Sequence, residues 1–184
     1  MKKQMIDIHC HLLHGVDDGS DDLDSSLDAL KLAEEAGFTD IILTPHYIKD
    51  YYDNSIENTK DKIKELKQEV FKNNILVNLH QGNEIYICDD ICDLLLEGVP
   101  STLASSKYVL FELPLTNKVF NVTDIIRKLK QNGYKPILAH PERYSYIQEN
   151  PNELIEYIRA GVLVQSNLRK YYRSLWKGCR KNTW

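Results

Sequence analysis

Several short apolar runs in this chain each stop at a residue whose side chain can bind a metal ion or carry a proton. In a barrel of parallel strands, the carboxyl ends of the strands converge on one mouth, where the chemistry takes place. An apolar strand that ends at a potential ligand, repeated five times, therefore predicts a multinuclear metal site in such a mouth. The runs are MIDIHCH, ending at His9 and His11, DIILTPH at His46, LVNLHQGNE at Glu84, YVLFEL at Glu112 and KPILAH at His140.

These runs alternate with longer segments that have the apolar period of an amphipathic helix, such as the segment 55–73. This alternation is typical of parallel strands joined by helices, so we expect an α/β fold. Pro45 should end the second strand, because proline cannot donate to a strand ladder. The expected strands are about 4–9, 40–44, 75–80, 85–87, 107–113, 135–139 and 162–167, and the expected helices are about 24–36, 55–73, 89–97, 122–132 and 151–160.

The bulk properties of the chain exclude several classes of protein. A length of 184 residues fits one domain with a real core. The net charge of -4 gives no electrostatic footprint for nucleic acid. The apolar runs are far shorter than the ~20 residues of a membrane span, and the first residues lack the apolar core of a secretory signal. The four cysteines have no C-x-x-C spacing and are expected to stay reduced. We therefore expect a cytoplasmic protein without membrane insertion.

Two of the candidate ligands lie on one strand. Side chains alternate across a strand, so His9 and His11 should point to the same side, together with Asp7. Two imidazoles arranged in this way can hold one cation. Imidazole suits many transition metals, whereas carboxylates suit Mn²⁺ and Mg²⁺ and can bridge two ions. The mixture of histidine and glutamate therefore favours a site for several divalent ions.

Six motifs, in order and spacing, resemble the metal-dependent bacterial protein-tyrosine phosphatases that occur with capsule and exopolysaccharide synthesis genes. These phosphatases belong to the polymerase and histidinol phosphatase superfamily. The resemblance covers about residues 5–167. The motifs are DIHCH at 7–11, VDDG at 16–19, TPH at 44–46, GNEIYI at 82–87, ELP at 112–114 and HPERY at 140–144.

The resemblance implies a distorted, TIM-like barrel of about seven strands with up to three metal ions. It favours manganese, with iron, zinc or magnesium as alternatives. It also implies hydrolysis of phosphotyrosine on a protein, such as a tyrosine autokinase of polysaccharide synthesis, by hydroxide held on the metals. Carried over position by position, the implied metal ligands are His9, His11, His46, Glu84, Glu112 and His140.

Two further residues resemble the catalytic pair of that family. Arg143 lies three residues beyond His140, where a guanidinium can bind phosphate oxygens in a bidentate manner. Its alternative role is a surface ion pair with Glu142 or Glu149. Asp18 matches the position that donates a proton or orients water, and its neighbour Asp17 competes for that role.

The resemblance stops after Asn167. The family continues with a strand that carries a Ser-Asp-x-His signature, whereas this chain continues with a basic, aromatic segment. We expect residues 1–167 to form a truncated metallophosphatase domain of about six strands, with 168–184 as an unrelated basic tail. Two alternatives therefore stay open: an inactive truncated remnant, and a small-molecule phosphoesterase such as a histidinol phosphatase.

Overall fold

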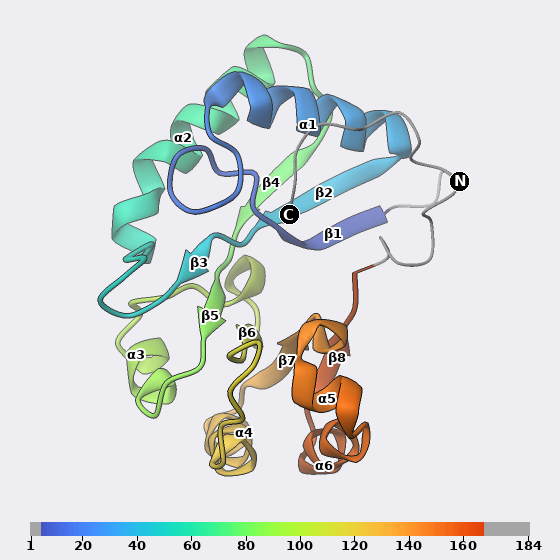
Figure 1. The fold of residues 1–184 in the computed structure, drawn as a ribbon. Helices are drawn as coiled ribbons and strands as arrows, with labels where there is room; N and C mark the ends of the chain where they lie inside the picture. The colour runs from blue at the N-terminus through green and yellow to red at the C-terminus, as the bar shows by residue number, and fades with distance from the viewer. Residues whose placement is uncertain (1–4, 168–184) are drawn as a thin grey trace.

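The computed structural model describes residues 5–167, and the basic segment 168–184 lies outside the described residues. The described chain alternates strands and helices in the order that an α/β fold requires (Figure 1). Its strands are β1 (Met5–Cys10), β2 (Phe38–Leu43), β3 (His46–Tyr47), β4 (Asn78–Gln81), β5 (Glu84–Tyr86), β6 (Tyr108–Glu112), β7 (Lys135–Ala139) and β8 (Leu163–Gln165). Its helices are α1 (Leu23–Ala36), α2 (Ile56–Lys72), α3 (Ile91–Leu96), α4 (Val122–Gln131), α5 (Ser145–Glu149) and α6 (Asn152–Ala160), with 3-10 turns η1 (Leu103–Ser105) and η2 (Pro141–Arg143).

The strands form two parallel sheets, and two segments of the chain run directly from a strand of one sheet into a strand of the other. One sheet has the order β1-β2-β4 and the other has the order β3-β5-β6-β7-β8. The chain passes from β2 to β3 and from β4 to β5 within two residues, so each of these pairs occupies one position. The eight strands therefore fill six positions. The prediction of an α/β fold with parallel strands is confirmed.

The ends of the two long N-terminal helices follow from local sequence. Asp22 caps α1 by accepting a hydrogen bond from the Ser25 backbone N–H at 2.8 Å. Gly37 ends α1 in the left-handed region, at a φ of 97°. Ser55 caps α2 by accepting from the Asn58 N–H at 3.3 Å. These caps fix where each helix returns to the sheet.

Successive side chains of a strand point to opposite faces of the sheet, so the residues of β2 belong alternately to two apolar clusters of the core. On β2, Ile41 and Leu43 pack against α1 and α2, whereas Ile42 points the other way and meets Leu110 and Ile137. Figure 1 shows α1 and α2 together on one side of the β1-β2-β4 sheet. The inner face is apolar at mid-strand and becomes charged toward the carboxyl ends of the strands.

Pro45 follows the end of the second strand and separates it from a short strand with a different partner. The ladder of β2 stops at Leu43, and β3 begins at His46 on a different partner, β5. The Pro45 carbonyl still accepts a hydrogen bond from the Glu84 N–H at 3.2 Å. The expectation that Pro45 forbids a continued ladder is confirmed, and its carbonyl remains available because a proline lacks only the donor.

Candidate metal centre

The six residues that the family resemblance marks as ligands come together at the carboxyl ends of the strands. Each lies within one residue of the end of a strand, except for Glu84 and His46, which open β5 and β3. Their side chains are largely buried, from fully buried Glu84 to His11 at 23% exposure. The six are His9, His11, His46, Glu84, Glu112 and His140.

Glu84 is the centre of this cluster. Its Oε2 lies 3.1 Å from Nε2 of His9, 3.1 Å from Nε2 of His11 and 3.3 Å from Nδ1 of His46. Its Oε1 accepts a hydrogen bond from Nε2 of His140 at 2.7 Å. One carboxylate thus faces four imidazoles that come from three separate parts of the chain, since His9 and His11 are both supplied by the end of β1.

Glu112 supplies a second carboxylate on the other side of His46. Its Oε1 lies 2.9 Å from Nδ1 of His46, and its Oε2 lies 3.8 Å from Nε2 of His140. In the parallel ladders His46 stands beside Glu84, and Glu112 stands beside Tyr86, two residues further along, so the register brings the three groups to the same end of neighbouring strands.

The donor atoms of the cluster are better placed to bind divalent cations than to form hydrogen bonds with one another. Glu84 Oε2 and His46 Nδ1 are buried and have no partner with hydrogen-bond geometry within the described chain, although nitrogen and oxygen atoms lie close by. Buried polar atoms without partners are rare in native structures, and an ion is one explanation for them. Three groups, each with its ligand atoms within 4.8 Å of one another, can hold a metal ion: His9, His11 and Glu84; His11, Asp18 and His46; His46, Glu84 and Glu112.

The cluster also shifts the acidity of its members. Burial alone would raise the pKa of Glu84, but the imidazoles of His11, His140 and His9 outweigh burial and hold its pKa well below the usual range. Burial would lower the pKa of His11, but its contacts with Asp17 and Glu84 outweigh burial and raise its pKa to about 10. The site is thus arranged for negative carboxylates facing positive charge.

Two residues behind the cluster orient its imidazoles. Asp17 Oδ2 lies 2.8 Å from Nδ1 of His11, and Gln165 Oε1 lies 2.9 Å from Nδ1 of His9. When Nδ1 of a neutral ring donates to such an oxygen, Nε2 is the atom that can bind a metal ion, and Nε2 of both rings lies on the side of Glu84. Neither residue was predicted in this role. Gln165 stands at the end of β8 and has the same strand-end position as the predicted ligands, but its neutral amide does not mark it as a metal-site residue.

The ends of β6 and β7 are tied together by Tyr144. Its buried hydroxyl donates to the Ala139 carbonyl at 2.9 Å and accepts from the Leu113 N–H at 3.1 Å. These bonds fix the strand ends that carry Glu112 and His140. His140 itself has a φ of 31°, and strained backbone of this kind clusters at functional sites.

The two aspartates of the VDDG motif have different surroundings. Asp17 is buried and also accepts from the backbone N–H groups of His46 and Gly19. The side chain of Asp18 is 49% exposed, and its Oδ1 lies 3.3 Å from Nε2 of His46. Gly19 lets this loop close, because a Cβ at that position would lie 2.1 Å from the His11 carbonyl oxygen. Asp18 is therefore the aspartate that faces the opening of the cluster.

Arg143 lies beside the cluster and not within it. It is exposed, and its backbone N–H donates to the His140 carbonyl at 2.9 Å. Within residues 5–167 its guanidinium makes no ion pair, so the alternative of a surface pair with Glu142 or Glu149 has no support. The remaining histidines, His14 and His80, lie outside the cluster and contact Glu65 and Asp40.

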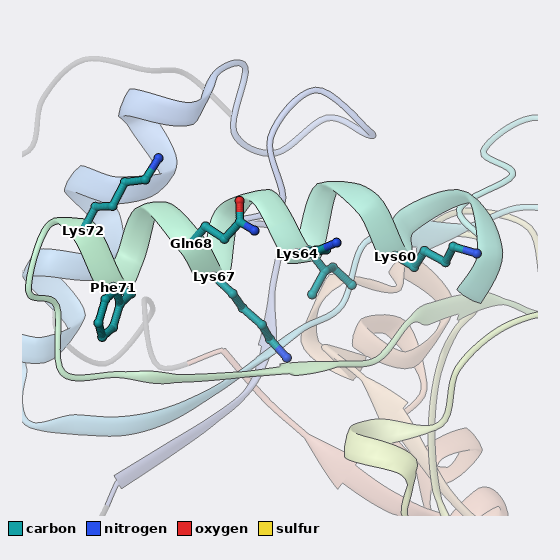
Figure 2. A pocket seen from close by; sticks show the side chains of 7 residues that line it. Lys60, Lys64, Lys67, Gln68, Phe71 and Lys72 are labelled. Carbon is teal, nitrogen blue, oxygen red and sulfur yellow. The ribbon is translucent and has the colours of Figure 1, made fainter.

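Two surface hollows lie away from the cluster. One, of about 680 Å³, runs along α2 between Lys60 and Lys72 (Figure 2), and another of about 680 Å³ lies beside it between α2 and β4. Neither is lined by a residue of the cluster.

The helices in the described part of the chain are too short or too polar to cross a bilayer.

Comparison with known proteins places the chain in a family. The model of the capsular polysaccharide synthesis family CpsB/CapC matches residues 5–171. CapC of Staphylococcus aureus is 37% identical and YwqE of Bacillus subtilis, a tyrosine-protein phosphatase, is 32% identical, each over 161 residues. Each alignment covers 88% of this chain and 63% of the relative, so the chain spans less than two thirds of these proteins.

A crystal structure gives the same result at the level of the fold. It comes from work on YwqE of Bacillus subtilis and CpsB of Streptococcus pneumoniae, described as metal-dependent tyrosine phosphatases. It matches with a TM-score of 0.85 and 32% identity, and it covers 88% of this chain and 66% of that one. The chain therefore belongs to the CpsB/CapC family of capsular polysaccharide synthesis proteins.

Proposed function

We propose that the strand-end cluster binds divalent metal ions, up to three, and that the loaded site hydrolyses phosphotyrosine on a protein. The observation that carries this proposal is the surroundings of Glu84, where one buried carboxylate oxygen faces three imidazole nitrogens at 3.1–3.3 Å without hydrogen-bond geometry. The kinship with YwqE and CpsB supports the choice of reaction.

The proposed ligands are His9, His11, His46, Glu84, Glu112 and His140, with Asp18 within reach of the same ions. Glu84, His11 and His46 each belong to two of the three possible metal groups, so they are the residues best placed to join neighbouring ions. Manganese is the proposed metal, because a site of mixed carboxylates and imidazoles suits it.

The bound ions supply Lewis-acid activation of water and neutralise charge on the phosphate. The residues of the chain hold the reactants in place. Arg143, exposed beside His140 and free of ion pairs within the described residues, binds the phosphate oxygens in a bidentate manner. Asp18, half-exposed at 3.3 Å from His46, positions water or gives a proton to the leaving oxygen. A phenolate, with a pKa near 10, leaves more easily than an alkoxide.

The proposal extends to the setting of the enzyme. The six strand positions form part of a distorted TIM-like barrel of the polymerase and histidinol phosphatase type. Residues 1–167 are its domain, and 168–184 form a separate basic segment. The substrate is a tyrosine autokinase of polysaccharide synthesis, and both proteins meet in the cytoplasm.

The test compares two substrates on the purified 184-residue chain loaded with Mn²⁺. We expect hydrolysis of a phosphotyrosine peptide to exceed that of histidinol phosphate. The double variant His9→Ala/His11→Ala should lose both the metal and the activity. His80→Ala is the matched control, because His80 pairs with Asp40 on the surface, at 39% exposure, outside the cluster.

Each alternative predicts a different result. Faster hydrolysis of histidinol phosphate would identify a small-molecule phosphoesterase. Full metal content without hydrolysis of either substrate would identify an inactive remnant. Equal losses in His80→Ala and in the double variant would show that the cluster is not the site.

A further inference from the structure

A pair of tyrosines lies beside the cluster, on the loop between β3 and α2. The ring of Tyr52 is stacked on the imidazole of His46, with centroids 6.1 Å apart and planes 11° apart. The ring of Tyr51 meets that of Tyr52 edge-on, at 4.6 Å and 71°. An aromatic surface thus continues outward from a proposed metal ligand.

The loop that carries these rings is held by its own backbone. Ile48 and Tyr52 exchange two backbone hydrogen bonds, at 3.0 Å and 2.8 Å, around a turn in which Asp50 has a φ of 64°. Beyond the turn, the buried Asn54 amide donates to the His46 carbonyl at 2.9 Å and to the Val16 carbonyl at 3.0 Å. Because the side chains of Tyr51 and Tyr52 make none of these bonds, the loop does not depend on them.

Core packing does not account for Tyr51. Tyr51 is 74% exposed, whereas Tyr47, four residues earlier, is 5% exposed and packs in the core. A large apolar ring at the surface has no stabilising burial, and when it lies beside a candidate site it is a natural contact for a ligand. Burial, Tyr51 and Asp18 together raise the pKa of Tyr52, so its ring stays neutral at physiological pH.

We propose that Tyr51 and Tyr52 form an aromatic platform that packs against the phenyl ring of phosphotyrosine while the phosphate lies in the cluster. This inference rests on the proposed function and assigns the residues that select aryl over alkyl phosphates. Aromatic pairs prefer stacked or edge-to-face arrangements with centroids 4.5–7 Å apart. Tyr52 lies face-on to His46, and the exposed Tyr51 lies edge-on against Tyr52.

Equilibrium binding to the Mn²⁺-loaded chain tests the platform without turnover. Benzylphosphonate carries the ring, and methylphosphonate carries the same phosphonate without it. We expect benzylphosphonate to bind about 2- to 10-fold more tightly, which is the gain from one aromatic pair. Tyr52→Leu should remove this gain and leave methylphosphonate binding unchanged. Tyr52→Phe should keep it, because the ring remains.

Tyr108→Leu is the matched control. Tyr108 is also a partly exposed tyrosine, at 37%, but it opens β6 and lies under Lys135 at the other end of the strands. Its loss should not change the ratio of the two affinities. For turnover, Tyr51→Ala and Tyr52→Leu should raise KM for a phosphotyrosine peptide with little change in kcat.

The outcomes separate this inference from the proposed function. Equal affinities for the two phosphonates in the unsubstituted chain would overturn the platform, as would an unchanged ratio in Tyr52→Leu. A ring-dependent gain that Tyr52→Leu removes would support the platform even if the phosphotyrosine peptide were not hydrolysed, and only the proposed reaction would then fail. Melting temperatures of the variants verify that the loop and the fold are intact.

Discussion

The strand-end cluster and the outer face of α2 are both rich in charged groups, but the charges are held in opposite ways. In the cluster, Glu84 is fully buried and the imidazoles around it come from distant parts of the chain. On α2, Lys60 and Lys72 are 53% and 64% exposed, and their ion pairs within residues 5–167 are with Glu57 and Glu69, one helical turn away. Figure 2 shows the lysines of α2 extending from one helix.

This contrast shows which charges the fold depends on. A buried charge must be compensated by partners or by bound ions, and removal of one partner leaves the others uncompensated. An exposed pair is screened by water and contributes little. Substitutions in the cluster should therefore change stability and metal binding, and similar substitutions on α2 should change neither.

The largest effect should follow from Glu84→Ala. Loss of this carboxylate leaves four imidazoles facing one another and removes the residue that two metal groups share. We expect loss of bound metal, loss of phosphotyrosine hydrolysis and about 3–5 kcal/mol of destabilisation of the Mn²⁺-loaded chain. Metal analysis and urea denaturation measure these changes. Glu57→Ala, an exposed carboxylate of α2, is the control, and an equal loss of metal there would contradict the contrast.

Arg143→Ala should act on turnover alone. The guanidinium is a phosphate clamp in our proposal and no ligand, so bound metal should stay constant. Removal of one charge-assisted contact in the transition state corresponds to roughly 2–4 kcal/mol, or about 30- to 1000-fold in phosphotyrosine turnover. Arg127→Ala, on the exposed face of α4, should keep full activity. Loss of metal from Arg143→Ala would show that Arg143 is structural.

A smaller effect should follow when an orienting residue is removed. Gln165→Leu takes away the partner of His9 Nδ1, and Asp17→Asn weakens the partner of His11 Nδ1. Loss of such a partner lowers metal affinity by about 10- to 100-fold. Metal titration with a competing chelator measures this. Gln68→Leu on α2, shown in Figure 2, should have no effect, and unchanged affinity in both site variants would mean that the rings are held in other ways.

The smallest effect should follow from Lys64→Ala/Lys67→Ala. Within the described chain neither lysine forms an ion pair, and both line the hollow along α2. Stability should change by less than about 0.5 kcal/mol per substitution, with metal content and hydrolysis of a small aryl phosphate unchanged. A loss of activity in this variant would give α2 a part in the site.

Much of the fold could be predicted from the sequence, because local signals agree with one another. Helix α1 has a capping aspartate, an apolar period and a terminal Gly37, and the prediction of 24–36 differs from the observed Leu23–Ala36 by one residue. The strand 135–139 was predicted at its observed bounds. In contrast, β4 begins at Asn78 and not near 75, because Ile75 and Val77 reach the core from a segment that pairs with no strand.

Parts of the site depend on three-dimensional neighbours and could not be predicted in the same way. Gln165 and Tyr144 support the cluster through contacts with Nδ1 of His9 and with two strand ends. Their residue types carry no metal-binding signal. The short β3 at His46 was also missed, because a two-residue strand has no periodicity and only its register beside Glu84 defines it.

The contact between His9 and Gln165 has a consequence for folding. It joins residues 156 positions apart, from the first and last strands of the described chain, whereas Glu84 and the other ligands lie between them in sequence. Contacts at such separations form late, since closing a long loop is entropically unfavourable until the intervening structure exists. His9 is therefore held in its position only after the strands between β1 and β8 have assembled. We expect the binding of a metal ion by His9 to follow the slowest phase of folding.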